Sequence, residues 1–408
     1  MTSVRPTLTT PVLLLMAAAT GLCAGGNYFN QPLLESIAAA LGTSHAAAAA
    51  TVTIAQVSYA LGLLFLVPLG DMLPQRRLAV TLMLAAAAGQ GLSGFAPNIG
   101  VLMVGTAMAG LFSVAAQVLV PFAADLATPE RRGSAVGTVM SGLLVGILLA
   151  RSVAGILAEL GGWTTVYRVS AVIMVVIAVA LWRVLPATTA TTRQGYGQTL
   201  RSLGSLVRTH PRLRSRALLG ALTFASVSAL FSTMAFLLSG PPHGLGDLEI
   251  GLVGLAGVGG AVAANLAGKL ADKGYGARTT AAGVVGLLAS WGALAAGASS
   301  LLWFVVGMLL IDLALQLVHV NNQNIVYTLD PAARSRLNSV YMTTYFAGAA
   351  SGSALGAIAW TNADWTGVCI LGVALGSCAV VVWAVDRRIA AGDDKTRAAS
   401  TGDVSAPR

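Results

Sequence analysis

Long runs of apolar residues alternate with short polar segments along the whole chain. A helix needs roughly 20 apolar residues to cross the hydrocarbon core of a bilayer. By that measure the chain holds twelve candidate spans. They run approximately over residues 11–40, 46–69, 78–96, 99–124, 134–158, 164–185, 215–239, 250–271, 279–298, 300–327, 336–360 and 365–385. The pattern predicts an all-α membrane protein with these spans as its transmembrane helices.

The basic residues fall in every second loop. All of the 24 lysines and arginines except Arg151 and Arg168 lie in segments that this topology places on one side of the membrane. Cytoplasmic loops are rich in Lys and Arg, so this side is expected to be the cytoplasm. Both termini are then cytoplasmic, and the number of spans is even. The basic segments are Arg76/Arg77, Arg131/Arg132, Arg201 to Arg216, Lys269 to Arg278, Arg334/Arg336 and the tail from Arg387.

The region around residues 187–214 divides the chain into two sets of spans. It contains several arginines among Thr, Gly and Ser, and it predicts a cytoplasmic linker with one amphipathic helix on the membrane surface. We therefore expect an N-terminal six-helix bundle, a linker, a C-terminal six-helix bundle and a disordered polar tail. Their expected bounds are 1–187, 188–213, 214–388 and 389–408.

The two halves repeat one another. Asp71 and Arg77 are six residues apart, as are Asp272 and Arg278. Five more residues of the first half recur in the second half, at nearly the same distance along the chain as separates Asp71 from Asp272. These are Pro129, Arg132, Met140, Gly146 and Trp163, which correspond to Pro331, Arg334, Met342, Gly348 and Trp365. Parallel repeats of this kind are typical of one large class of transporters.

Composition agrees with a membrane protein and excludes other classes. Mean hydropathy is +0.78 and only 10% of the residues are charged, against about 25% in soluble domains. The net charge of +9 would suggest nucleic-acid binding in a soluble protein. Here the basic residues line the cytoplasmic rim, where they face anionic lipid, so we expect no nucleic-acid partner. The three cysteines lie in apolar spans and indicate no disulfide framework.

One loop carries a recognisable motif. The segment Gly70-Asp71-Met-Leu-Pro-Gln-Arg76-Arg77 resembles the signature loop of the major facilitator superfamily, although Met and Pro replace a basic residue and a glycine. The second copy, which contains Gly268 and Asp272, keeps the pattern better. The stretch from Asn27 to Leu34 resembles the first helix of bacterial drug and metabolite exporters. The resemblance covers the chain up to about Arg388.

The resemblance implies a fold and a gate. The fold is two six-helix bundles related by pseudo-symmetry. In the family the loop aspartate, here Asp71, docks on helix 11 of the other bundle, and the basic residue, here Arg77, pairs with an acid at the end of helix 4, here Asp125. Solvated loop charges are the alternative interpretation. The gating candidates are Gly70, Asp71, Arg76, Arg77, Asp125, Gly268, Asp272 and Arg278.

Helix 5 departs from the exporter pattern. Exporters of this kind often carry Gly-x-x-x-Gly-Pro-x-x-Gly-Gly there, whereas this chain has Ile147 at the proline and Ala150-Arg151 at the glycine pair. A stripe of small residues remains, and another lies on helix 11, so close helix contact is expected at both. We expect these stripes to pack the two bundles against each other. Their members are Gly142, Gly146, Ala150 and Ala154, and Thr344, Gly348, Gly352 and Gly356.

Three charged residues lie well inside the spans: Arg151, Arg168 and Asp312. Charge is costly in a membrane, which makes such residues functional candidates. Arg168 is near a helix end and can extend toward water. Asp312 is the acid nearest a helix centre, and a buried carboxyl can exchange a proton near neutral pH. With His319, two turns further on, it is the proton-coupling candidate; a structural pairing of Asp312 with Arg151 is the alternative.

Polar side chains gather on helix 10, where they cannot all face lipid. In the family, helices 1, 4, 7 and 10 line a central cavity, and polar residues on this chain's helices would converge there. The substrate-cavity candidates are Asn27, Tyr28, Asn30, Gln31, Gln117, Arg151, Ser232, Gln316, Asn322, Tyr341 and Tyr345.

The sequence thus predicts a secondary active transporter of a small organic solute, working by alternating access with proton-coupled efflux. Proton-coupled import or uniport is the alternative, and a non-transporting membrane sensor is a remote one. No nucleotide-binding motif, metal-ligand spacing or coupled nucleophile and base is found. We expect no enzyme activity, no cofactor and no metal. The expected partners are the solute, protons and lipid, for a monomer in the bacterial inner membrane.

Overall fold

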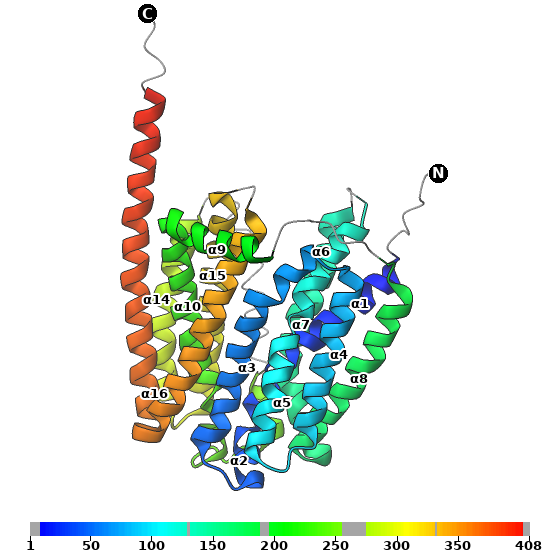
Figure 1. Ribbon diagram of the computed structural model, residues 1–408. Helices are drawn as coiled ribbons and strands as arrows, with labels where there is room; N and C mark the ends of the chain where they lie inside the picture. The colour runs from blue at the N-terminus through cyan, green and yellow to red at the C-terminus, as the bar shows by residue number, and fades with distance from the viewer. Residues whose placement is uncertain (1–8, 129–130, 188–195, 255–274, 331–332, 403–408) are drawn as a thin grey trace, which may run out of the picture.

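A computed structural model describes residues 9–128, 131–187, 196–254, 275–330 and 333–402. The described residues fold into helices that run roughly parallel in two groups, one from each half of the chain (Figure 1). Eight of these helices are long and apolar enough to cross a membrane. Each expected span coincides with a described helix or with consecutive helices, except 250–271, of which only the first part is described. The all-α architecture is confirmed.

The N-terminal half contains spans that are continuous helices and spans that are broken. The first span ends its regular helix at Gly25 and resumes at Gln31. The fourth is interrupted at Ser113 and Val114. The elements are α1 (Thr10–Gly25), η1 (Gln31–Leu33), α2 (Leu34–Leu41), α3 (His45–Phe65), η2 (Val67–Asp71), α4 (Gln75–Gly94), α5 (Ile99–Phe112), α6 (Ala115–Leu126), α7 (Arg132–Gly161) and α8 (Trp163–Val184).

The C-terminal half repeats the break in its first span, which ends at Phe231 and resumes at Met234. Its last helix, α16, contains non-helical torsion angles at Ala363 and Asp364, so it is two antiparallel spans joined by a tight turn. The elements are α9 (Tyr196–Thr209), α10 (Pro211–Phe231), α11 (Met234–Ser239), α12 (Asp247–Val253), α14 (Gly276–Ala296), α15 (Leu301–Leu329) and α16 (Arg334–Gly402).

Local sequence accounts for several helix ends. The side chains of Ser44 and Asn98 accept hydrogen bonds from backbone N–H groups in the first turns of α3 and α5, which satisfies donors that have no partner within the helix. Pro211 begins α10, where its missing N–H costs nothing. Gly42 ends α2 in the left-handed conformation, with φ of 58°, which glycine adopts without steric cost.

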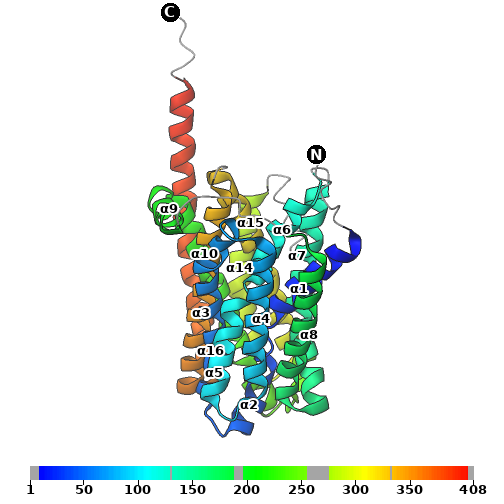
Figure 2. The same cartoon turned by 45° about the vertical axis from the view of Figure 1, so that its right-hand side comes forward.

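The linker contains the expected amphipathic helix. α9 crosses the ends of the C-terminal helices (Figures 1 and 2). It buries Leu203 and Leu206, and the Tyr196 hydroxyl donates to the carbonyl of Phe65 across 2.8 Å. We call this side of the molecule, where the arginine-containing loops also lie, the basic side.

The first part of the expected tail is helical, and its residues after Gly402 lie outside the described part of the chain. α16 continues as a helix through Gly402 and extends beyond the bundle (Figure 1). Alanine has the highest intrinsic helix propensity, and this stretch contains the pairs Ala390-Ala391 and Ala398-Ala399. Once α16 has been nucleated inside the bundle, each added residue extends an existing helix, so no new nucleus is needed.

The small-residue stripes do not join the bundles, and that prediction was wrong. On α7, a β-carbon at Gly142 would contact the backbone of Ala17, and one at Gly146 would contact that of Gly21. The stripe on α16 packs in the same way on Ala221 and Ala225 of α10. The stripes therefore fasten the fifth span to the first within each bundle. Sequence spacing identifies the close contact, but it does not identify the partner helix.

A buried ion pair holds the basic end of the C-terminal bundle together. Arg216, at the start of α10, pairs with Asp386 near the basic end of the last span, and both side chains are almost fully buried. Ser215 donates to the second oxygen of Asp386 across 2.6 Å. The guanidinium also donates to the Asn322 side chain across 3.2 Å and to Thr280 across 3.5 Å. Four helices thus share one network.

Removing one member of this pair should be costly, because it leaves a buried charge without its partner. We expect Asp386→Ala to lower the free energy of unfolding by about 3–5 kcal/mol, measured by thermal or denaturant unfolding of the purified protein in micelles. The double variant Arg216→Met with Asp386→Leu is the control. It removes both charges, so it should recover much of the loss. Equal unfolding midpoints for Asp386→Ala and the wild type would contradict this role.

Candidate functional site

The two bundles touch in the half of the molecule away from the basic side. The Ser36 hydroxyl donates to Asp247 across 2.5 Å, and Thr53 donates to Ser353 across 3.0 Å. Burial raises the pKa of the Asp247 carboxyl, the bond from Ser36 lowers it, and the charges of Glu159 and Glu35 raise it. His45 of α3 stacks on Phe236 of α11, with ring centroids 4.4 Å apart. The structure is therefore closed between the bundles on this side.

Another close contact between the bundles joins α7 and α12. The Ser152 hydroxyl donates to the carbonyl of Gly251 across 2.9 Å. A β-carbon on Gly251 would lie 2.7 Å from the carbonyl oxygen of Arg151, and one on Gly155 would lie 2.5 Å from that of Asp247. Glycine is required at both positions for the helices to approach so closely. This packing presses the aliphatic part of the Arg151 side chain against Gly254.

Arg151 directs its guanidinium into the region between the bundles. Its side chain is only 6% exposed. Nε donates to the Gln31 side chain across 2.7 Å. The guanidinium carbon lies 3.8 Å from the centre of the Phe231 ring and 5.1 Å from that of Tyr28. Tyr28 and Gln31 reach this position because the first span breaks between α1 and η1. Phe231 is at the corresponding break in the other bundle.

Asp312 of α15 is at the same depth as Arg151. Arg151 is ten residues from the end of α7 and Asp312 is eleven from the start of α15, which puts both roughly 15–17 Å from the helix ends away from the basic side. Their charges are close enough to interact. The ion pairs formed by described residues do not include one between them.

Aromatic and imidazole side chains extend this group toward the basic side. The His319 Nδ1 and the Tyr341 hydroxyl are 3.0 Å apart. The Tyr345 ring lies 4.6 Å from that of His319 and stacks on Phe224 at 4.2 Å. Tyr345 is also close enough to Tyr28 and Asp312 for electrostatic interaction. We call the following set the central cluster: Tyr28, Gln31, Arg151, Phe231, Asp312, His319, Tyr341 and Tyr345.

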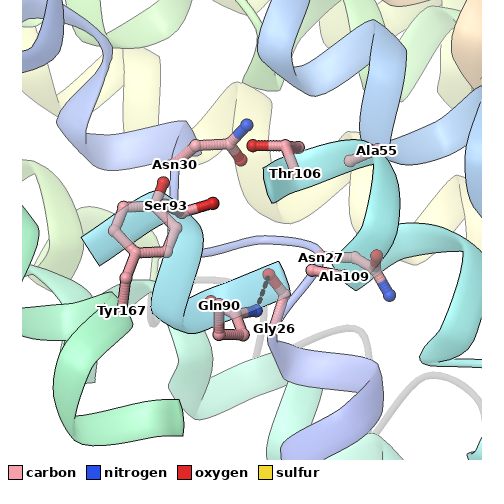
Figure 3. A pocket seen from close by; sticks show the side chains of 9 residues that line it. All are labelled: Gly26, Asn27, Asn30, Ala55, Gln90, Ser93, Thr106, Ala109 and Tyr167. Carbon is pink, nitrogen blue, oxygen red and sulfur yellow. Dashed lines mark hydrogen bonds between the residues drawn. The ribbon is translucent and has the colours of Figure 1, made fainter. Parts of the chain in front are cut away.

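Asn27 and Asn30 face a different place. They line a small pocket inside the N-terminal bundle, behind the break in the first span, together with Gln90 and Ser93 (Figure 3). Buried oxygens of Asn30, Gln90, Ser93, Thr106 and Tyr167 have no hydrogen-bond partner. The cavity volume is about 10 Å³, which suits one water molecule. This pocket is too small for an organic solute.

The other cavity candidates are dispersed. Gln117 donates to the Tyr59 hydroxyl across 3.3 Å within the N-terminal bundle. Ser232 is fully buried and bonds to Ala229 at 3.1 Å. Asn322 belongs to the network of Arg216. Its side-chain oxygen accepts from the guanidinium, and its side-chain nitrogen donates to the backbone carbonyl of Arg216. Gln316 lies half-buried on α15. Of the predicted cavity residues, Tyr28, Gln31, Arg151, Tyr341 and Tyr345 meet in the central cluster.

The gating motif is only partly described. Asp125 accepts a hydrogen bond from Gln75 at 2.9 Å, while Arg77 is exposed. Arg76 donates to the carbonyl of Leu185 across 2.9 Å and lies over the Trp182 ring. Arg278 lies over Tyr275. A β-carbon at Gly70 would lie 4.0 Å from the Val118 side chain. The Asp71 side chain, Gly268 and Asp272 lie outside the described residues.

Two features were missed by the sequence reasoning. Arg216 was counted in a basic segment and Asp386 was not considered, yet they form the buried pair described above. Phe231 was not considered at all, although its ring covers the guanidinium of Arg151. Both roles depend on which helix lies opposite the residue. Only the break at Ser232 and Thr233, which corresponds by pseudo-symmetry to the break in the first span, could have indicated Phe231. Among the described residues, His, Cys, Asp and Glu side chains form no group that could hold a metal ion.

Comparison with known proteins places this arrangement in a family. The model of the Major Facilitator Superfamily matches residues 16–352. The uncharacterized transporter YgaY of Escherichia coli O157:H7 is 49% identical over 383 residues, covering 94% of this chain and 97% of that protein. The probable transporter SCO4007 of Streptomyces coelicolor is 33% identical over 378 residues, with coverage of 90% and 85%.

A solved structure has the same fold. The bacterial homolog of the human lysosomal transporter Spinster, in an inward-facing and occupied conformation, superposes with a TM-score of 0.73 at 15% identity, covering 93% of this chain and 97% of that one. The family match spans most of the chain and the relatives are transporters. The chain therefore belongs to the Major Facilitator Superfamily and is a multi-pass membrane transporter of a solute, not an enzyme.

Proposed function

We propose that this protein exports a small organic solute across the bacterial inner membrane in exchange for protons. The observation that carries the proposal is the presence of two opposite charges at one depth, Arg151 on the N-terminal bundle and Asp312 on the C-terminal bundle. Charge at such a depth is costly unless it serves a ligand or an ion. The relatives' description as transporters and the exporter-like first helix support the same reading.

Alternating access follows from the way the bundles touch. The positive-inside rule makes the basic side the cytoplasm, so the contacts between Ser36 and Asp247 and between Thr53 and Ser353 close the periplasmic side. Rocking of the two bundles about the central cluster breaks these contacts and opens that side. The gate residues of the cytoplasmic side, Asp71 with its counterpart Asp272, would then hold the opposite state closed.

Asp312 is the proton carrier in this proposal. A carboxylate between the bundles can take a proton from one aqueous side and release it to the other as the bundles rock. His319 shares a hydrogen bond with Tyr341, which gives it a positioning role on the same face of α15. Import together with protons is the alternative, favoured by the absence of the exporter proline at Ile147. The direction of proton movement on adding solute separates the two.

Substitution of the proton carrier provides the direct test. In energised inside-out vesicles with a pH-sensitive dye, we expect substrate addition to dissipate the proton gradient in the wild type. Asp312→Asn should abolish this response while the protein remains folded and inserted, because an amide cannot carry a proton. A panel of small organic compounds supplies the substrates.

Asp364→Asn is the matched control, since Asp364 lies in the turn between the last two spans and has φ of 45°, a conformation that asparagine tolerates. It should behave like the wild type. Retained proton movement in Asp312→Asn would remove Asp312 from the mechanism. Gradient formation, in place of dissipation, would support import.

Alternating access can be tested with a reversible cross-link. Thr53 and Ser353, on different bundles, have their hydroxyl oxygens 3.0 Å apart, so side chains at these two positions reach one another across the boundary. We expect Thr53→Cys with Ser353→Cys, in a background without the native cysteines, to lose transport on oxidation and regain it on reduction. Each single cysteine variant should be insensitive to oxidation. Undiminished transport by the fully cross-linked protein would exclude separation of the bundles at this point.

A further inference from the structure

We infer that the transported solute is a small zwitterion, whose carboxylate binds Arg151 and whose ammonium group binds Asp312. The inference rests on the proposed exchange of solute for protons. Arg151 and Asp312 each need a counter-charge, and exchange with protons limits which solutes can supply both.

Arg151 lacks an anion. Nε is bonded to the neutral Gln31, and the flat faces of the guanidinium are covered by Phe231 and Tyr28. The described residues supply neither a hydrogen-bond acceptor to its two Nη nitrogens nor an ion-pair partner. A buried charge without a counter-charge is strongly unfavourable. The edge that carries these N–H groups has the fork geometry that binds a carboxylate in a bidentate manner.

Asp312 must lose its proton when the solute binds, because exchange requires that proton and solute exclude one another at the carrier. A purely anionic solute at Arg151 would do the opposite, since a second negative charge near Asp312 would draw a proton into the site. An ammonium group solves this conflict: it replaces the proton as the counter-charge of the carboxylate. The proton leaves Asp312 for water on one side, and a proton from the other side restores the neutral carboxyl after the solute has left.

The two charges also restrict the form of the solute. Arg151 and Asp312 lie at one depth, and the ion pairs of the described residues do not include one between them, so a ligand that bridges them carries two separate charges. Aromatic rings from both bundles surround the same place, namely Tyr28, Phe231 and Tyr345. Such faces suit an apolar substituent and also an ammonium group, through cation–π attraction. An amino acid or a close analogue fits this description.

The test removes one charge of the ligand and one charge of the protein at a time. Four ligands are built on each of three skeletons, those of glycine, leucine and phenylalanine: the free amino acid, its amide, its N-acetyl derivative and its N-acetyl amide. In that order, the four ligands carry both charges, only the positive charge, only the negative charge and no charge. Their binding to the purified protein in nanodiscs is measured by calorimetry, for the wild type, Arg151→Gln and Asp312→Asn.

We expect the wild type to bind at least one free amino acid on the order of ten-fold or more tighter than each of its derivatives, as a charge-assisted hydrogen bond implies. Arg151→Gln should lose the preference for the amino acid over its amide and keep the preference over the N-acetyl form. Asp312→Asn should show the reverse pattern. Arg168→Gln and Asp364→Asn, which change charges outside the cluster, should match the wild type.

Three results would overturn the inference: binding of the neutral derivative as tightly as the amino acid, no binding by any of the three skeletons, or an unchanged ligand preference in Arg151→Gln. Arg151→Lys guards against misfolding, since it keeps the charge and should retain part of the preference. The measurement needs no proton gradient. A protein that binds zwitterions with this pattern but moves no protons would keep the inference on the ligand and refute the proposed exchange.

Discussion

Hydrocarbon solvates neither charges nor free backbone polar groups, and this cost governs the rest of the structure. Most charged side chains lie in the loops of one side, and those at depth are placed where protein surrounds them. Arg216 and Asp386 neutralise one another inside the C-terminal bundle. Arg151 is treated differently. It lies beside a neutral amide and two aromatic rings at the boundary between the bundles, so its remaining N–H groups lie where the two bundles face each other.

The breaks in the helices also place polar and aromatic side chains where protein surrounds them. Regular helix stops at Gly25 in the first span and at Phe231 in the corresponding span of the second half. Each break turns side chains of one helix toward the partner bundle, so Tyr28 and Phe231 approach the guanidinium from opposite halves. Behind the first break, a polar pocket takes up the amides of Asn27 and Asn30. Irregular backbone at membrane depth is tolerated where protein or water satisfies it.

Much of the fold could be predicted from the sequence, because span length and loop charge are properties of single segments. Contacts between segments could not. The glycine stripe of helix 5 was correctly read as a site of close approach and wrongly assigned to the other bundle, since its spacing carries no information about the partner. Arg151 and Asp312 stood out because charge is rare in such spans. Arg216 and Phe231 did not, because their roles depend on helices more than 60 residues away along the chain.

The seam between α7 and α12 is built from glycines whose missing side chains make room for the neighbouring backbone. A single methyl group at Gly251 would collide with the backbone of Arg151 and Gly155 on the other bundle, so it would destabilise the closed arrangement. A penalty that differs between two conformations is what shifts a two-state equilibrium. The missing β-carbons at this seam thus stabilise the close approach of α7 and α12, and one added carbon would favour any arrangement in which these helices lie further apart.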